Sequence, residues 1–302
     1  MNNGKITLAI IPLSTCAGCE NTILDLEEKL FFLADFIDIV YAPIIMDSKP
    51  PSSVDIAIFT GAIRTDEDER KVKVWRKKCK ILVALGSCAT LGGIPGLANL
   101  TIVEDLLKQI YVNHPNVQNP RGKEPNLDIP KLVNQVKILK DLVKVDYSIP
   151  GCPPPKKLVE KFFQAMINGG EFKLPDKSVC DECPLNTGEK KVMEKIKRWG
   201  IDPVDPNKCL LEQGFLCLGP VTRSGCEARC IRAGYPCRGC MGPPKGITDQ
   251  AADMISVIGS IVSLDKIEVE DLMKIKDLSG SLYRFTLPSS TFKGKIRRKL
   301  NG

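Results

Sequence analysis

Residues 5–20 read KITLAIIPLSTCAGCE, a short apolar run that is followed at once by the pair Cys16 and Cys19. Further apolar runs occur in the first half of the chain, at residues 37–43, 54–61, 80–89 and 143–155. Helix-like stretches alternate with them, at residues 21–36, 66–79 and 156–169. Strands that alternate with helices predict an α/β fold, in which helices cover both faces of a parallel sheet.

Four cysteines of the first half lie just past predicted strand ends: Cys16, Cys19, Cys88 and Cys152. The carboxyl ends of parallel strands meet at one edge of a sheet, where open α/β sheets bind their ligands. Small or imino residues flank these cysteines, so backbone amides can approach the sulfur atoms. The alternative is four separate buried thiols, since free cysteine packs as a small hydrophobe. We expect a metal cluster at this edge.

Eight more cysteines crowd into residues 173–247, at Cys180, Cys183, Cys209, Cys217, Cys226, Cys230, Cys237 and Cys240. Glycine and proline are frequent there, and little hydrophobic periodicity is visible from residue 202 to residue 246. Metal ligation can stabilise such a segment, because ligand binding is coupled to folding. We therefore expect a sheet domain over residues 1–170 and a smaller, mostly irregular, cysteine-rich domain over residues 171–302.

The chain has 13 cysteines and one histidine in 302 residues. It has no run of 18 apolar residues and no N-terminal signal-peptide pattern, so we expect a cytoplasmic protein without a membrane span. Clustered cysteines in the reducing cytosol are more often metal ligands than disulfides. A non-redox alternative remains open at this stage, because paired Cys-x-x-Cys motifs also build structural zinc sites and would make the chain a zinc-stapled scaffold.

The formal net charge of +7 counts every thiol as neutral. An oxidised four-iron cluster with four thiolates carries about −2, so three such clusters would bring the total to about +1. The basic balance is thus weak evidence for nucleic acid, and the sequence has no recognisable nucleic-acid motif. We expect no nucleic-acid partner.

An ordered set of cysteine motifs spans most of the chain. In the first half the motifs are Cys16-Ala-Gly-Cys19-Glu20, Gly86-Ser-Cys88-Ala89 and Pro150-Gly-Cys152-Pro-Pro154. In the second half they are Cys180-Asp-Glu-Cys183, the segment from Cys217 to Cys226, and Cys237-Arg-Gly-Cys240-Met-Gly-Pro-Pro244. In this order the motifs resemble those of the small subunit of nickel–iron hydrogenases. The resemblance covers about residues 5–260 and implies a flavodoxin-like domain followed by an iron–sulfur domain.

The resemblance also implies three [4Fe-4S] clusters and divides the cysteines among them. Cys16, Cys19, Cys88 and Cys152 match the proximal cluster; Cys180, Cys183, Cys209 and Cys217 match the distal one; Cys226, Cys230, Cys237 and Cys240 match the medial one. Electrons from hydrogen would pass along this relay. The nickel–iron site would belong to the large subunit, so the chain is expected to be part of an oxidoreductase without being catalytic alone.

Two departures from the common pattern narrow the resemblance. Many family members have histidine at the position of Cys180, and many lack a counterpart of Cys230 and hold a three-iron medial cluster. These two departures and the missing secretory leader make the chain similar to one type of small subunit. This type belongs to the cytoplasmic, methyl-viologen-reducing hydrogenase of methanogens, which does not reduce coenzyme F-420. That type passes electrons through a ferredoxin-like or [2Fe-2S] partner subunit to heterodisulfide reductase. The deazaflavin-reducing small subunits and other cluster-relay subunits, such as those of complex-I-like enzymes, remain alternatives.

Several features have competing interpretations. Glu20 follows Cys19 and either assists proton movement or hydrogen bonding near the proximal cluster, or is simply a carboxylate stabilised at a helix start. We expect His114 to be solvated in a polar loop and Cys79 to be a packing residue and no ligand. The basic tail, residues 289–302, is expected to be a mobile end or a docking strip.

Overall fold

The computed structural model describes residues 4–189, 191–263, 265–267, 275 and 277–293. The chain divides into two compact units, of which the second is Lys173–Thr286. The first comprises Met1–Phe172 and takes up the chain again from Leu287. The sequence assigned residues 171–302 to a single domain, whereas the 3₁₀ turn Leu287–Ser289 packs within the first unit.

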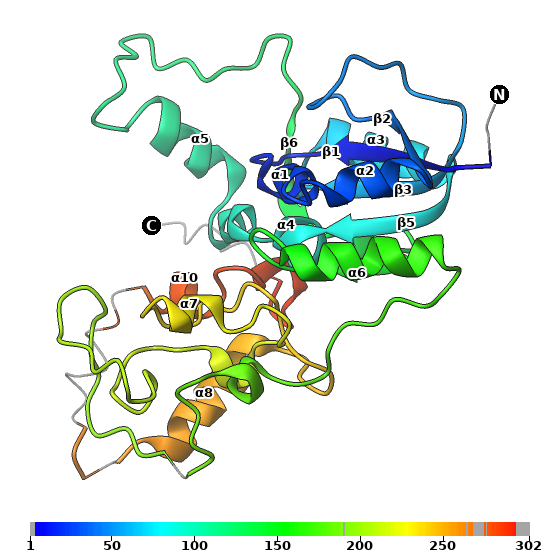
Figure 1. Ribbon diagram of the computed structural model, residues 1–302. Helices are drawn as coiled ribbons and strands as arrows, with labels where there is room; N and C mark the ends of the chain where they lie inside the picture. The colour runs from blue at the N-terminus through cyan, green and yellow to red at the C-terminus, as the bar shows by residue number, and fades with distance from the viewer. Residues whose placement is uncertain (1–3, 190, 264, 268–274, 276, 294–302) are drawn as a thin grey trace. The chain divides into compact units, whose positions relative to one another are not determined.

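A five-stranded parallel sheet forms the centre of the first unit (Figure 1). Its strands are β1 (Ile6–Pro12), β2 (Ile37–Tyr41), β3 (Val54–Thr60), β5 (Cys79–Leu85) and β7 (Tyr147–Ile149). They lie in the order β2-β1-β3-β5-β7, and every neighbouring pair is parallel. This is the flavodoxin-like order, in which the chain reverses direction across the sheet after its first two strands. The predicted α/β class is confirmed.

Helices cover both faces of the sheet. The helices of this unit are α1 (Gly18–Leu24), α2 (Lys29–Ala34), α3 (Asp66–Arg76), α4 (Gly86–Leu91), α6 (Lys156–Ile167) and α5 (Val103–Tyr111). Of these, α5 has no buried residue and extends away from the sheet in Figure 1. Val72 and Trp75 of α3 pack with Ala9, Ala57 and Phe59 on one face. Figure 1 shows α1, α2 and α6 on the other. The central strands are therefore buried on both sides, which explains their continuous apolar runs.

The single helix that the sequence predicted over residues 21–36 is two short helices, α1 and α2. The break contains Asp25, Glu27 and Glu28, and Glu27 has a positive φ of 55°. Carboxylates are unfavourable at the negative C-terminal end of a helix, so these residues end α1 instead of extending it.

A second, two-stranded sheet lies beside the main one and was not predicted. Its strands β4 (Ile63–Thr65) and β6 (Leu132–Lys137) are antiparallel. Asp68, in the first turn of α3, accepts hydrogen bonds from the amides of Arg64 and Thr65 and from the hydroxyl of Ser14. This buried carboxylate thus fixes the loop that follows β1, just before Cys16.

Among the described residues, no single helix is long and apolar enough to span a membrane. By length and composition alone, the segments Gly86–Leu100 and Val103–Tyr111 pass that test together, with a bend of 76° between them.

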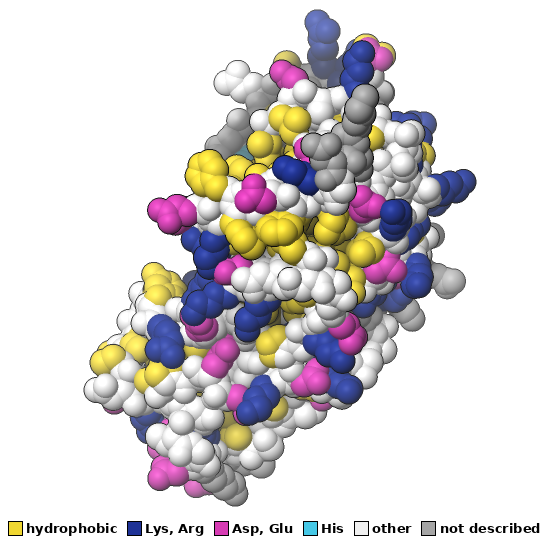
Figure 2. All heavy atoms as spheres, turned by 45° about the vertical axis from the view of Figure 1, so that its right-hand side comes forward, with side chains coloured by type: hydrophobic (Ala, Val, Ile, Leu, Met, Phe, Trp, Pro, Cys, Tyr) yellow, Lys and Arg dark blue, Asp and Glu magenta, His cyan; other side chains and the backbone are white. Residues whose placement is uncertain are grey.

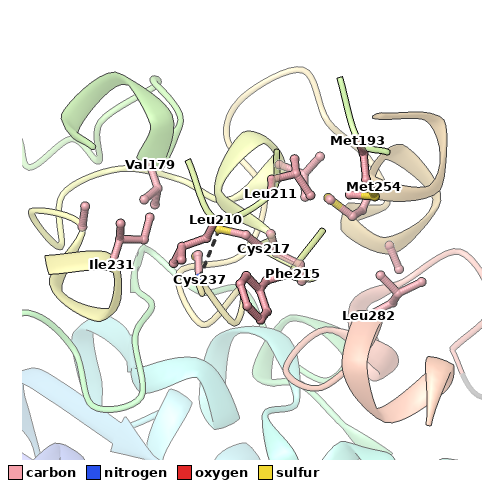
Figure 3. Packing of buried hydrophobic residues seen from close by; sticks show 14 of the residues in the cluster. Val179, Met193, Leu210, Leu211, Phe215, Cys217, Ile231, Cys237, Met254 and Leu282 are labelled. Carbon is pink, nitrogen blue, oxygen red and sulfur yellow. Dashed lines mark hydrogen bonds between the residues drawn. The ribbon is translucent and has the colours of Figure 1, made fainter. Parts of the chain in front are cut away.

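The second unit is built mainly from loops around an apolar core. Its helices include α7 (Arg229–Arg232), α8 (Gln250–Ile261) and α10 (Leu278–Leu282). Val179, Leu210, Phe215, Cys217 and Met254 are among the core residues, and Figure 3 shows them packed together. The sequence found little periodicity here because loops, and not one repeating helix or strand, supply most of these side chains.

Charges are mixed on the face of the molecule that Figure 2 shows. Lysine and arginine side chains lie between aspartate and glutamate side chains there instead of forming one continuous strip. In the fold as a whole, charges are matched across neighbouring elements, as in Lys137 with Glu69 and Arg76 with Asp146. A continuous basic strip is what nucleic-acid binding requires, and the described side chains on this face do not form one.

Asp55 links the amino ends of three central strands, and we expect Asp55→Asn to loosen the sheet. Its carboxylate accepts hydrogen bonds from the amide and hydroxyl of Thr7 in β1, at 2.9 and 2.7 Å, and lies 2.7 Å from the ammonium of Lys80 in β5. Burial alone would raise the pKa of Asp55, but these bonds lower it to about 2. Losing charged hydrogen bonds should cost about 1.5 kcal/mol of opening free energy, measured by hydrogen exchange of the β1 and β3 amides.

The stabilisation from Asp55 should be present above its unfolded pKa of about 3.9. It should fall away as the pH drops toward the folded pKa of about 2. The difference between wild type and D55N should therefore be largest near neutral pH and shrink between these two values. Asp38→Asn, at an exposed carboxylate on β2, is the control and should change little. Equal protection in D55N and wild type at pH 7 would contradict this account.

Candidate iron–sulfur centres

The four cysteines predicted to form the proximal set converge at the carboxyl edge of the main sheet. Beyond β1 the chain pairs with the turn after β3, since Leu13 donates to the carbonyl of Thr60 at 2.9 Å and Ser14 pairs with Ala62. This places Cys16 in a loop and Cys19 in the first turn of α1. Cys88 lies in α4, directly after β5, and Cys152 follows β7. The structure thus brings together residues that lie far apart in the sequence.

Glycines leave room for the sulfur atoms at this edge. A Cβ atom on Gly86 would lie 2.2 Å from Sγ of Cys19, and one on Gly93 would lie 2.5 Å from Sγ of Cys88. A Cβ on Gly18 would lie 3.5 Å from Sγ of Cys16. Side chains at Gly86 and Gly93 would fill the space that the thiols occupy, so the backbone forms a cradle around them.

The thiols of this set destabilise one another's ionised forms. Burial raises the pKa of Cys19 well above its usual value, and Glu20, Cys88, Cys152 and Cys16 raise it further. Burial likewise raises the pKa of Cys88 to about 12, with added effects from Cys152 and Cys16. Iron ions at their centre would reverse this effect, because a coordinating thiol is deprotonated by the metal. The donor set therefore fits an iron–sulfur cluster.

Glu20 lies beneath this set and is 1% exposed. The hydroxyl of Thr60 donates a short hydrogen bond to its Oε1, while Oε2 is buried without a hydrogen-bond partner among the described residues. A buried, unsatisfied carboxylate oxygen is costly. Its burial goes beyond what an ordinary helix-start carboxylate requires. The proposed role of Glu20 near the cluster stays a prediction.

The four cysteines of the predicted distal set line one cavity of about 270 Å³ in the second unit. Leu210, Leu211 and Ile231 contribute apolar walls, and Lys191 lies at the same cavity. A Cβ on Gly219 would lie 3.3 Å from Sγ of Cys180 and 3.6 Å from Sγ of Cys217. This set therefore has a glycine beside its sulfur atoms, as the first set does.

Charge effects also connect the members of the distal set. Burial raises the pKa of Cys180 to about 12, and the neighbouring Cys217, Cys209 and Cys183 add to the shift, against an opposing effect of Lys191. Burial raises the pKa of Cys217 to about 11, although the amides of Gly219 and Cys237 donate hydrogen bonds that act in the opposite direction. Amides that donate to a cysteine sulfur stabilise its thiolate and would adjust the potential of a cluster held there.

The predicted medial set adjoins the distal one. Figure 3 shows Cys217 next to Cys237, where the amide of Cys237 donates to Sγ of Cys217 at 3.3 Å. Burial raises the pKa of Cys237, and the charges of Cys217 and Cys240 raise this pKa further. Cys226 is hydrogen-bonded to Glu182. Cys230 is exposed.

Within the part of the chain that the structure describes, no group of three or more histidine, cysteine, aspartate or glutamate side chains is arranged to hold one metal ion. The prediction of iron–sulfur clusters rests instead on the order of the cysteine motifs along the chain.

The residues outside the three sets have ordinary surroundings. Cys79 begins β5, is 8% exposed and directs its thiol to the carbonyl of Arg76. His114 is exposed, and its Nδ1 accepts the amide of Asn116. Residues 294–302 of the predicted basic tail lie outside the described residues.

Two charged residues of the second unit were missed at the sequence level. Glu182 lies between Cys180 and Cys183 but bonds to the segment that carries Cys226. Arg238 is half-buried; burial lowers its pKa, as does Arg284, whereas the thiolates of Cys230, Cys217 and Cys237 raise it. Both residues lie within Cys-x-x-Cys motifs, which could have drawn attention to them. The sequence does not show which groups their side chains contact.

Comparison with known proteins places these centres in context. Residues 16–166 match the family described as NADH ubiquinone oxidoreductase, 20 Kd subunit. The chain is 42% identical to the G subunit of the vhu F420-non-reducing hydrogenase of Methanocaldococcus jannaschii, over 97% of this chain and 100% of that protein. It is 35% identical to the iron-sulfur G subunit of the F420-non-reducing hydrogenase of Archaeoglobus profundus, over 96% of this chain and 99% of that protein.

A solved structure is similar to part of the chain. It is a chain of an NAD⁺-reducing [NiFe]-hydrogenase in the H₂-reduced state, with a TM-score of 0.54 and 32% identity. The similarity covers 57% of this chain and 96% of that chain.

Gly86→Ala should abolish the predicted proximal cluster. The new Cβ would lie 2.2 Å from Sγ of Cys19, and the φ of +88° already disfavours any side chain. We expect a loss of about four iron atoms per chain, measured as iron and acid-labile sulfide in the purified complex.

Gly169→Ala is the matched control for this substitution. Its φ is +64° and its Cβ would meet nothing within 4 Å, so it has a similar backbone strain without the clash. It should keep the wild-type iron content. If G86A has the same iron content per chain as the wild type, Gly86 is not required to make room for the cysteine sulfur atoms.

Proposed function

The chain belongs to the family described as NADH ubiquinone oxidoreductase, 20 Kd subunit, among the F420-non-reducing hydrogenase G subunits, and we propose that it is the electron-transfer subunit of a nickel–iron hydrogenase. The observation that carries this proposal is the convergence of two separate cysteine sets. One is at the carboxyl edge of the sheet, and the other lines a cavity of the second unit. The chain would therefore be an oxidoreductase subunit that relays electrons and breaks no bond alone.

Three [4Fe-4S] clusters would be held by twelve cysteines, divided as the resemblance implies. When bound, such a cluster takes up and releases one electron at a time. The residues of the chain would supply the thiolates, donate amides to sulfur and exclude water. Gly219 and Cys237 donate to Cys217, and Leu210 and Leu211 wall the distal cavity. The adjoining positions of Cys217 and Cys237 support a direct passage between the medial and distal clusters.

A hydrogenase large subunit is the proposed partner on the side of the proximal set. Cys16 and Cys152 are exposed in the chain alone, so a partner that covers them would shield the proximal cluster from water. That subunit would hold the nickel–iron site. Twelve cysteines of this chain are assigned to the three clusters, and the remaining one, Cys79, directs its thiol to a backbone carbonyl.

The acceptor side of the proposal rests on the relatives. Proteins named as F420-non-reducing hydrogenase subunits in methanogens match nearly the whole chain, which supports a role in methanogenesis, and a cytoplasmic location is part of the same proposal. Electrons would then leave the distal cluster for a ferredoxin-like or [2Fe-2S] subunit and continue to heterodisulfide reductase. The deazaflavin-reducing type is the competing assignment, and reduction assays with each acceptor would separate the two.

Iron analysis tests the cluster count directly. We expect about twelve iron atoms and as many acid-labile sulfides per chain in the complex with its large subunit, and a brown protein. A value near four would reduce the relay to one cluster. A colourless protein that contains zinc would establish the scaffold alternative instead.

Cys230→Ala should convert one four-iron cluster into a three-iron cluster. Cys230 is the exposed member of the medial set, so its removal takes away one ligand without opening the apolar core. Electron paramagnetic resonance of the oxidised complex should then show a new three-iron signal. Cys79→Ala, which removes a thiol outside the three sets, should leave the spectrum unchanged. A wild-type spectrum in C230A would take Cys230 off the ligand list.

A further inference from the structure

Two segments that carry cysteines of different sets run side by side in the second unit. Residues 177–179 lead into Cys180, and residues 222–224 lead into Cys226. The amide of Val179 donates to the carbonyl of Thr222 at 2.7 Å, and the amide of Ser224 donates to the carbonyl of Lys177 at 2.9 Å. Ser178 and Arg223 form an antiparallel bridge between them. The backbone therefore ties the start of the distal set to the start of the medial set.

Glu182 extends this connection past the end of the paired segments. Its carboxylate accepts the amide of Gly225 at 2.9 Å through Oε2, and the amides of Cys226 and Ala228 at 3.2 and 3.1 Å through Oε1. Three backbone donors thus converge on one half-buried side chain. Backbone amides that converge in this way form a concave anion site, which here is filled from within the chain.

The turn around Cys226 depends on this carboxylate for its shape. Gly225, Glu227 and Ala228 all have positive φ, at 107°, 57° and 51°. For Glu227 and Ala228, which have a Cβ, this left-handed conformation is unfavourable. Hydrogen bonds to a charged acceptor are strong enough to offset that cost. Without Glu182, we expect the turn at residues 225–228 to relax to a less strained backbone conformation, which would move Cys226 from its position in the medial set.

We propose that Glu182 is a positioning residue that couples the two cysteine sets of the second unit. It fixes Cys226 to the short segment between Cys180 and Cys183, so that the distal and medial clusters assemble in one relative position. Oε1 also lies 3.5 Å from Sγ of Cys226, so its negative charge would favour the oxidised state of a cluster held there and lower the reduction potential of that cluster. This inference rests on the proposed function, because it needs the cluster that Cys226 would hold.

Two substitutions separate the positioning effect from the charge effect. Glu182→Gln keeps an oxygen that can accept the amides of Cys226 and Ala228 but removes the charge. We expect it to retain the wild-type iron content and to shift the potential of the medial cluster upward in a redox titration of the holo complex. Glu182→Ala removes both effects, and we expect it to lose medial iron and to gain a three-iron resonance signal, with the proximal and distal signals unchanged.

Glu194→Ala is the matched control, since Glu194 is an exposed glutamate of the same unit that pairs with Lys266. It should keep both the iron content and the potential. A Glu182→Ala complex with the full medial signal overturns the positioning role, and an unchanged medial potential in Glu182→Gln overturns the charge effect. If the wild-type complex itself lacks the medial cluster, the proposed function fails, which is a distinct result from either of these.

Discussion

Thiols that are crowded together in buried places are the constraint on which the rest of this structure depends. Burial raises the pKa of Cys19 and Cys88 in the first unit and of Cys180 and Cys217 in the second, and neighbouring thiols raise each of these pKa values further. An arrangement of this kind is unfavourable for thiolates in the absence of positive charge. Iron would supply that charge, so the same crowding that is costly for the chain alone would suit a cluster ligand set.

The two units meet this constraint by different means. In the first, parallel strands end at one edge, and the turns after β1, β5 and β7 deliver cysteines that lie up to 136 residues apart in the sequence. Regular hydrogen bonding fixes their positions. In the second, short backbone pairings and side chains such as Glu182 do this work, while Leu210, Phe215 and Met254 provide an apolar core from loops. Irregular structure therefore does not mean a loosely held site.

The sequence predicted the features that follow from local pattern and was less successful where competing local effects decide. The five strands of the main sheet were found because each lies within an apolar stretch of sequence, and β1, β3 and β5 are largely buried. The helix over residues 21–36 was wrong in its length, because a cluster of acidic residues ends α1 early. The pair β4 and β6 escaped notice, since two short strands separated by a long excursion have no sequence signal of their own.

The sequence by itself determined the α/β class and singled out the twelve candidate ligands, because strand periodicity and cysteine spacing are local properties of the chain. Only the tertiary structure decided that four cysteines share one cavity and that the amide of Cys237 meets the sulfur of Cys217. It alone revealed the partners of Glu182 and the burial of Glu20. Contacts of this kind join residues that are distant in the chain, and their energies depend on burial and geometry that exist only once the chain has folded.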